Sequence, residues 1–226
     1  MNDVNMATTA QSAMTSGQVA PLPRSIRKRQ AIIEAATQAF LASGYSRTSM
    51  DEVSRLAKVS KQTVYMHFGD KERLFTEIIM AIVHSAGDPI DNAVKGLGES
   101  DNLEVDLVNH ACDQLTGVLQ PEPMQLRRLI IAEATTFPAL GRALYDLGPG
   151  RTIAELAKVF ARLHDRGLLE VNDPGRAGSD FNWLVMSEPL NRAMLLGETE
   201  PPDQAAIKEW AGQAVRTFLA AYRKET

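Results

Sequence analysis

The sequence predicts an all-α protein, and three observations support this fold class. Apolar residues recur three and four positions apart along most of the chain, which is the period of an amphipathic helix. The 226 residues contain neither sustained alternation of β-branched residues nor an Asn-Gly or Asp-Gly hairpin turn. Hydrophobic residues make up 44% of the chain, which is enough to build a core and excludes disorder throughout. We expect about nine or ten helices at this spacing.

The first residues of the chain differ from the rest. Residues 1–23 lack periodicity, are rich in Ala, Ser, Thr and Gln, and end in Pro21 and Pro23. Such a segment cannot bury enough apolar surface to fold. We therefore predict a disordered tail over residues 1–23, with helices from there onward.

A glycine and a capping box mark the first two helices. Residues 25–43 carry apolar side chains on one face, and Gly44 follows them, where a residue with positive φ ends a helix at little cost. Thr48 and Asp51 form a Thr-x-x-Asp box, in which the hydroxyl caps amide groups at a helix start. This box predicts a second helix that begins at Thr48 and ends near Val59.

Polar caps and prolines delimit the remaining helices. Ser60 caps a short helix over residues 61–68, which Gly69 ends, and Asp70 caps a longer helix that Pro89 kinks or ends. Clusters of Pro and Gly then separate further amphipathic segments. These segments are predicted at residues 103–119, 123–135, 138–147, 152–166, 174–196 and 202–224.

Cysteine content and hydropathy predict a cytoplasmic protein. The single cysteine, Cys112, excludes an internal disulfide and fits a reducing compartment. No apolar run reaches the roughly 18–20 residues of a membrane-spanning helix. The first residues also lack the basic and apolar regions of a secretory signal. We therefore expect no membrane partner.

Charge is distributed unevenly along the chain. Residues 21–80 hold 10 Lys and Arg against 6 Asp and Glu, a net charge of +4, whereas residues 81–226 hold 14 against 21, a net charge of -7. Together with Asp3 these give the total of -4. A basic block on an acidic chain indicates that one end binds a polyanion.

The basic block contains a helix-turn-helix pattern. Residues 48–68 form two short helices joined by a tight turn, with a supporting helix before them. In this arrangement the first helix fixes the angle of the second, which is short enough to lie in a major groove. Residues 61–67 (KQTVYMH) include no acidic side chain, which phosphates would repel. A plain helical corner within a bundle is the alternative.

This region resembles the DNA-binding domain of TetR-family transcriptional regulators over about residues 27–76. The stretches RQAIIEAATQAFLASGYSRT and SMDEVSRLAKVSKQTVYMHFGDKERLF carry the resemblance. The matching positions are Phe40, Gly44, Thr48, Val53, Ala57, Val59, Ser60, Tyr65, Phe68, Lys71 and Leu74. The remainder resembles more loosely the ligand-binding half of the AcrR/AefR-like branch, especially in LRRLIIAEATTFPALGRALYDLG.

The resemblance implies a division of the chain and a function. Residues 24–70 are expected to bind DNA, and residues 71–226 to bind an effector and dimerise. The function implied is a repressor that binds a palindromic operator in double-stranded DNA as a homodimer and responds to a small hydrophobic effector. A constitutive repressor or architectural protein without an effector is the alternative, which the lack of a cavity in the C-terminal half would favour.

The candidates for DNA contact come from the motif and the resemblance. They are Arg27, Thr48, Ser60, Lys61, Gln62, Thr63, Tyr65, His67 and Lys71. Gln62 lies on the first turn of the second short helix and is suited to pair with an adenine. Lys71 and the amide end of the helix at Thr48 are expected to hold phosphates. The basic residues around Arg27 either reach an adjacent groove or form a solvated face.

Candidates for the other two surfaces come from the C-terminal half and the helix before it. For the effector pocket they are Met80, His84, His110, Leu115, Phe137, Trp183 and Met186, with plain core packing as the alternative. For the dimer interface, which the resemblance places on the last two helices, they are Phe181, Leu184, Ile207, Trp210, Ala214 and Phe218.

The sequence offers no motif for chemistry. The histidines and Cys112 fit no zinc spacing, so no metal site is expected. A nucleophile elbow, a phosphate-binding glycine loop and paired Glu-x-x-His motifs are also absent. We therefore expect no enzymatic activity, no catalytic residues and no cofactor.

Overall fold

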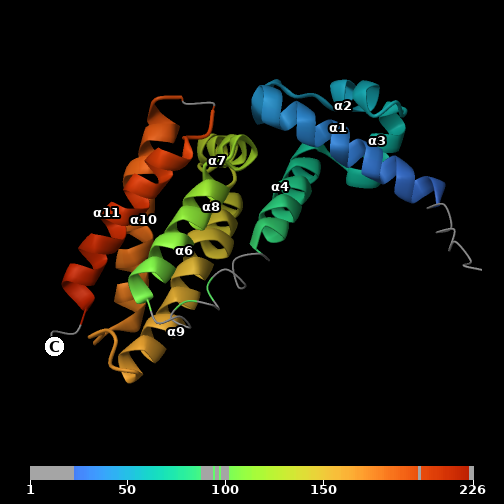
Figure 1. Cartoon of the computed structure of the whole chain (residues 1–226). Helices are drawn as coiled ribbons and strands as arrows, with labels where there is room; N and C mark the ends of the chain where they lie inside the picture. Colours follow the sequence, from blue (N-terminus) through green and yellow to red (C-terminus); the bar gives the residue numbers. More distant parts are fainter. Residues whose placement is uncertain (1–22, 88–93, 95–96, 98–101, 198–199, 224–226) are drawn as a thin grey trace, which may run out of the picture.

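The computed structural model describes residues 23–87, 94, 97, 102–197 and 200–223, and these residues confirm an all-α fold (Figure 1). The tail predicted over residues 1–23 lies outside them apart from Pro23, and so does Pro89. Four helices, α1 to α4, form the N-terminal part of the chain. Their bounds are α1 Arg24–Arg47, α2 Met50–Leu56, α3 Lys61–Phe68 and α4 Lys71–Gly87.

The C-terminal helices agree with the predicted segments to within a few residues, because prolines and polar caps mark their starts. Asn102, Asp173 and Asp203 each accept a hydrogen bond from a backbone N–H in the first turn of α6, α10 and α11. The helices are α6 Leu103–Val118, α7 Pro121–Glu133, α8 Pro138–Tyr145, α9 Arg151–Asp165, α10 Pro174–Leu195 and α11 Gln204–Tyr222, with a π-helical turn η1 at Asp146–Gly150 between α8 and α9.

The start of α2 differs from the predicted capping box. Ser49, not Thr48, is the N-cap, and its Oγ accepts a hydrogen bond of 3.1 Å from the Glu52 N–H. The Thr48 hydroxyl is buried and donates to the carbonyl oxygens of Ala39, at 3.2 Å, and Gly44, at 2.9 Å. Gly44 breaks α1 with a φ of 79°, so that α1 carbonyls near the break use the Thr48 hydroxyl and the cap moves one residue along.

The described helices build two hydrophobic clusters. The N-terminal cluster lies among α1, α2, α3 and α4 and includes side chains of α7 and α8. The C-terminal cluster lies among α6, α9, α10 and α11, and its centre is a group of stacked and edge-packed rings from Phe160, Phe181 and Phe218. Figure 1 shows α1, α2 and α3 at one end of the molecule and α10 and α11 at the other.

An aromatic junction joins the two ends. The ring of Phe137, at the start of α8, lies 4.8 Å from the Tyr45 ring and 5.5 Å from the Phe75 ring, measured between centroids. Tyr45 belongs to α1 and Phe75 to α4. Helix α4 also packs against α8 and η1. The N-terminal helices therefore share a core with the C-terminal part. Within the described ranges, no helix is long and apolar enough to cross a membrane.

A close approach of α9 and α10 depends on Gly178. A Cβ at this position would lie 2.7 Å from the Ile153 carbonyl oxygen and 3.1 Å from the Ala157 nitrogen. We predict that Gly178→Ala lowers the free energy of unfolding by about 1–3 kcal/mol, because backbone atoms cannot move aside. Urea unfolding followed by circular dichroism measures the change.

Gly117→Ala is the matched control for this substitution. A Cβ on Gly117 would meet nothing within 4 Å, and the residue lies within α6. The control is expected to leave stability unchanged or slightly raised, because alanine favours the helix. Equal stability of the two variants would contradict close packing at Gly178.

Candidate nucleic-acid interface

Helices α2 and α3 form a helix-turn-helix whose angle is set by buried side chains. Val53 of α2 and Val64 and Phe68 of α3 are buried in the N-terminal cluster. Between the helices, Lys58 takes a φ of 54°, and the Val59 N–H donates to the Ser54 carbonyl at 3.1 Å. A left-handed residue lets the chain turn sharply from one helix into the next. The two helices are therefore held as one rigid unit.

The start of α3 uses two of the predicted DNA-binding residues. The Ser60 Oγ accepts a hydrogen bond from the Thr63 N–H at 3.1 Å and lies 2.8 Å from the Thr63 hydroxyl. At the other end Gly69, with a φ of 79°, stops the helix. Ser60 and Thr63 thus define where α3 begins, and a contact of either side chain with DNA stays a prediction.

The outward face of α3 is formed by Gln62, Tyr65 and Met66. Gln62 is exposed, and the exposed fractions of Tyr65 and Met66 are 43% and 75%. Sequence reasoning missed Met66, because it selected hydrogen-bonding and aromatic side chains of this helix as the DNA contacts. The signal was available, since Met66 lies two residues from both Val64 and Phe68, about 200° around the helix from each buried side chain.

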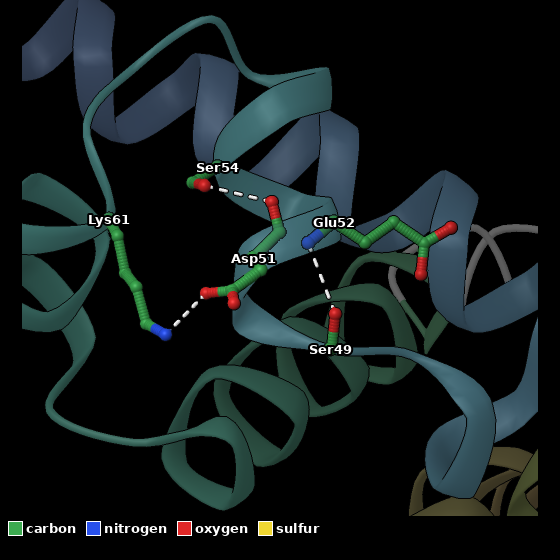
Figure 2. Close-up of polar contacts among 5 residues, drawn as sticks. All are labelled: Ser49, Asp51, Glu52, Ser54 and Lys61. Atoms are coloured by element: carbon green, nitrogen blue, oxygen red, sulfur yellow. Dashed lines mark hydrogen bonds and ion pairs between the residues drawn. The ribbon is translucent and has the colours of Figure 1, made fainter.

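Lys61 is held by an acidic residue of α2 (Figure 2). Its Nζ lies 2.6 Å from Oδ1 of Asp51 and 6.0 Å from the centroid of the Tyr65 ring. The hydrogen bond to Asp51, with its negative charge, raises the pKa of the Lys61 ammonium. Figure 2 also shows Ser49 and Ser54 bonded within the same helix. Lys61 therefore links α3 to α2 on the surface of the protein. A phosphate of DNA would compete with Asp51 for the Lys61 ammonium group.

The remaining basic candidates differ in how freely they face solvent. Arg27 is exposed on the first turn of α1. Arg29 forms an ion pair with Glu77 of α4, and its guanidinium lies 5.2 Å from the Phe68 ring centroid. Lys71 is half-buried, with its Nζ 4.2 Å from the centroid of the Tyr45 ring. Of the arginines around Arg27, Arg29 is therefore a packing residue.

His67 lies on the flank of α3 rather than on its outward face. It is half-buried, and its ring centroid lies 6.2 Å from that of Phe68. Its Nε2 is enclosed and makes no hydrogen bond within the described structure. The contact of His67 with DNA therefore cannot use Nε2 in this conformation, and it stays a prediction.

The predicted effector residues whose side chains the structure describes do not lie in one hydrophobic cluster. Three belong to the C-terminal cluster or its edge and two to the N-terminal cluster, because their faces pack against different neighbours. Trp183 is 39% exposed on α10, and its assignment to a pocket stays a prediction. The side chain of His84 lies outside the described residues. His110, Leu115 and Met186 lie in the C-terminal cluster or at its edge, and Met80 and Phe137 belong to the N-terminal cluster.

Two features of the C-terminal part escaped sequence reasoning. The first is a pocket of about 430 Å³, open solvent included, where the end of α6 meets α7, α10 and α11, with Arg128 and Trp210 in its wall. The second is a polar pair inside the C-terminal core. The Gln114 Nε2 donates to the Asn182 Oδ1 at 2.9 Å, and Asn182 is 1% exposed. The other amide atoms, Gln114 Oε1 and Asn182 Nδ2, are buried without a hydrogen-bond partner in the described structure.

Four of the six predicted interface residues are corrected by their burial. They fill the core of this chain itself, so no face of them is left for a partner: Phe181, Ile207, Ala214 and Phe218. Trp210 is partly buried, and Leu184 is 39% exposed, so these two stay predictions. The apolar side chains exposed on α10 are Trp183, Leu184 and Leu195, the last at 80%.

Two family profiles match the chain. Residues 32–78 match the profile of bacterial regulatory proteins of the tetR family. Residues 106–224 match the C-terminal domain of AefR-like transcriptional repressors, which is more than half of the chain. Both profiles describe transcriptional regulators.

Individual proteins agree with the profiles. A TetR-family regulator from Mesorhizobium loti MAFF303099 is 38% identical, with a TM-score of 0.78 over 90% of this chain and 100% of that one. The flavonoid-responsive regulator FrrA is 30% identical, with a TM-score of 0.69 over 88% and 99%. The regulator SrpR of Pseudomonas putida is 31% identical over 145 residues, which are 64% of each chain. That match spans less than two thirds of this curated relative.

From the ion pair between Asp51 and Lys61 we predict that the negative charge of Asp51 lowers the affinity for DNA. Asp51→Asn frees the Lys61 ammonium and removes an acid beside the outward face, so affinity for any duplex is expected to rise several-fold. The dependence of log affinity on log salt should steepen by about one unit, because one more phosphate is neutralised. Fluorescence anisotropy on an arbitrary duplex at several salt concentrations measures both.

Glu34→Gln is the control, because it removes an equal charge from the exposed surface of α1, where Glu34 bonds only Gln30 of the same helix among the contacts described. We expect this control to change affinity much less. Weaker binding by Asp51→Asn than by the wild type would show that the pair is needed to hold α3 in place.

Proposed function

The chain belongs to the TetR family of bacterial transcriptional regulators and carries an AefR-like C-terminal domain, and on that premise we propose that it is a ligand-modulated repressor. A homodimer binds a palindromic operator in double-stranded DNA, and a small apolar or amphipathic effector changes that binding. Residues 24–70 form the DNA-binding domain and residues 71–226 the effector-binding and dimerisation domain, in the cytoplasm. The outward face of α3 carries the proposal.

This face suits the major groove in shape and charge. Gln62 offers an amide that pairs with an adenine edge, and Tyr65 and Met66 offer apolar surface. Acidic side chains are absent from α3, whose residues are KQTVYMHF. Exposed cations at Arg27 and Lys58 lie on the same domain, where phosphate contacts orient the protein without reading sequence.

Dimerisation rests on the exposed apolar side chains of α10. Trp183, Leu184 and Leu195 face away from the C-terminal core, and apolar side chains grouped on a surface are typical of interaction sites. Leu184 and Leu195 are 11 residues apart, which places them on the same side of a helix. A two-fold pair presents two copies of α3, about 34–36 Å apart, to successive major grooves.

The polar pair in the core supports an effector that combines apolar surface with hydroxyl groups. Leaving Gln114 Oε1 and Asn182 Nδ2 without partners costs stability, and costs of this kind are typical of functional sites. A hydroxyl donates to the first atom and accepts from the second. FrrA is named for its response to flavonoids, which are hydroxylated aromatic molecules. We take this chemical class for the effector of this chain.

The effector acts by shifting a population of conformers. The aromatic junction of Tyr45, Phe75 and Phe137 connects the C-terminal part to α1 and α4. A conformer with a different junction presents α3 at a different angle. A coupling of about 1–3 kcal/mol changes operator affinity by about 5–150-fold. The alternative, a constitutive repressor without an effector, is favoured by the complete burial of Leu115 in a packed core.

Selection from randomised duplexes tests the proposed function. The full-length protein is expected to enrich a palindrome with half-sites about one duplex turn apart or a multiple of it, and sedimentation should show a dimer. Gln62→Ala should weaken binding to the enriched duplex by about 1–3 kcal/mol and relax the preference at one position. A strictly monomeric protein that enriches no sequence would refute the proposal.

The polar pair gives a second test, which separates the proposal from its alternative. Gln114→Met together with Asn182→Leu removes two unpartnered buried atoms at similar volume, so the free energy of unfolding should rise by about 1–3 kcal/mol. The variant should keep operator binding but no longer respond to a flavonoid that releases the wild type. Unfolding curves and operator anisotropy measure these effects. Lower stability, or an unchanged flavonoid response, would show that the pair is only structural.

A further inference from the structure

We propose that Met66 reads the 5-methyl group of a pyrimidine in the operator and so determines specificity at one position of each half-site. This inference rests on the proposed function, because it requires α3 to lie in the major groove. The chemical group recognised is the methyl of thymine, or that of 5-methylcytosine at the same position. Met66 thereby distinguishes thymine from cytosine without a hydrogen bond.

The position of Met66 on α3 directs its side chain away from the protein core. Its side chain is 75% exposed, whereas Val64 and Phe68 on the same helix are buried. Because Met66 lies about 200° from both of them, it points directly away from the core. A helix that lies in a groove with its core side toward the protein presents Met66 to the groove. Tyr65, at 43% exposed, lies nearer the protein surface.

The exposure of Met66 is unusual among the methionines of the described chain. Met50, Met124 and Met186 are between 2% and 6% exposed, and each fills a core. The free energy of an exposed apolar side chain falls when another surface covers it and removes it from water. Because Met66 lies near polar side chains such as Gln62, a surface that covers it should offer hydrogen-bonding edges with a small apolar group among them.

The major groove offers such a surface. Each thymine presents a C5-methyl group beside hydrogen-bonding edges, and cytosine lacks it. Methionine is unbranched and flexible, so its end can adapt to a methyl at slightly different depths. Gln62, one turn earlier on the same side, offers the amide that a neighbouring adenine requires.

A protein partner fits this face less well. Tyr65 is the other large exposed apolar side chain on α3, and Lys61 and Gln62 surround the pair with polar groups. Protein interaction sites are larger contiguous apolar patches. Two apolar side chains with polar neighbours make a small patch, which favours DNA over a protein partner.

The experiment removes one methyl group at a time. Each thymine of the duplex enriched by the full-length wild type is replaced by deoxyuridine in one half-site, which deletes the methyl and keeps base pairing. At one position, affinity should fall about fourfold, the effect of about 0.8 kcal/mol for one buried methyl. At the same position, a duplex with 5-methylcytosine should bind about fourfold more tightly than the duplex with cytosine.

Variants of the side chain assign the effect to Met66. In Met66→Ala the difference between thymine and deoxyuridine at that position should disappear, whereas Met66→Leu should retain part of it. All three residues favour a helix, so the fold is expected to persist, and circular dichroism checks this. Val105→Ala, which trims an exposed apolar side chain of α6, is the matched control and should retain the full difference.

Several outcomes would overturn the inference while the proposed function stands. One is a wild type that selects a palindrome but discriminates no thymine from deoxyuridine. Another is a difference of the same size in Met66→Ala and the wild type. A third is a Met66→Ala variant that weakens every duplex equally, which would assign Met66 to the DNA backbone. A wild type that selects no sequence would overturn the inference and the proposed function together.

Discussion

The burial of Val64 and Phe68 in the N-terminal core is the constraint on which the DNA-binding face depends. These two side chains set the rotation of α3 about its own axis, and every outward residue follows from that rotation. The cap at Ser60 and the glycine at Gly69 set the length of the helix. The exposed ion pair between Lys61 and Asp51 links α3 to α2 on the surface and engages a cation that DNA would otherwise attract.

The aromatic junction links this face to the rest of the molecule. Tyr45 contacts Phe75 and Phe137, and the Lys71 ammonium lies over its ring. Burial, and then the negative charges of Glu72, Asp70 and Glu133, raise the pKa of the Tyr45 hydroxyl above its ordinary value. Because rings of α1, of α4 and of the N-cap of α8 meet here, the proposed effector response would pass through this junction to the helices that pack against α3. Packed aromatic rings transmit a displacement because they cannot be compressed.

In the C-terminal part, an apolar stripe that packs in the core of its own chain is not available to a partner chain. The stripe of α11 that includes Ile207, Ala214 and Phe218 covers the core of its own chain. The proposed dimer contact therefore falls on the opposite side of α10, at Trp183, Leu184 and Leu195. In this proposal stability and assembly use different faces of α10, and Asn182, which pairs with Gln114 of α6, lies on the inner face.

Most of the fold was predictable from the sequence, because helix limits are encoded locally. Glycine at 44 and 69, polar caps at 60, 70, 173 and 203, and proline at helix starts act within four residues, and so does the spacing that places Val64 and Phe68 on one side of α3. Partners across the chain were not predictable in this way. The capture of Thr48 by α1 carbonyls, the pairing of Gln114 with Asn182 over 68 residues and the burial of Phe181 and Phe218 depend on which helix faces which. Only tertiary packing decides which helices face each other, because an amphipathic stripe indicates that one face of a helix is covered but not which element covers it.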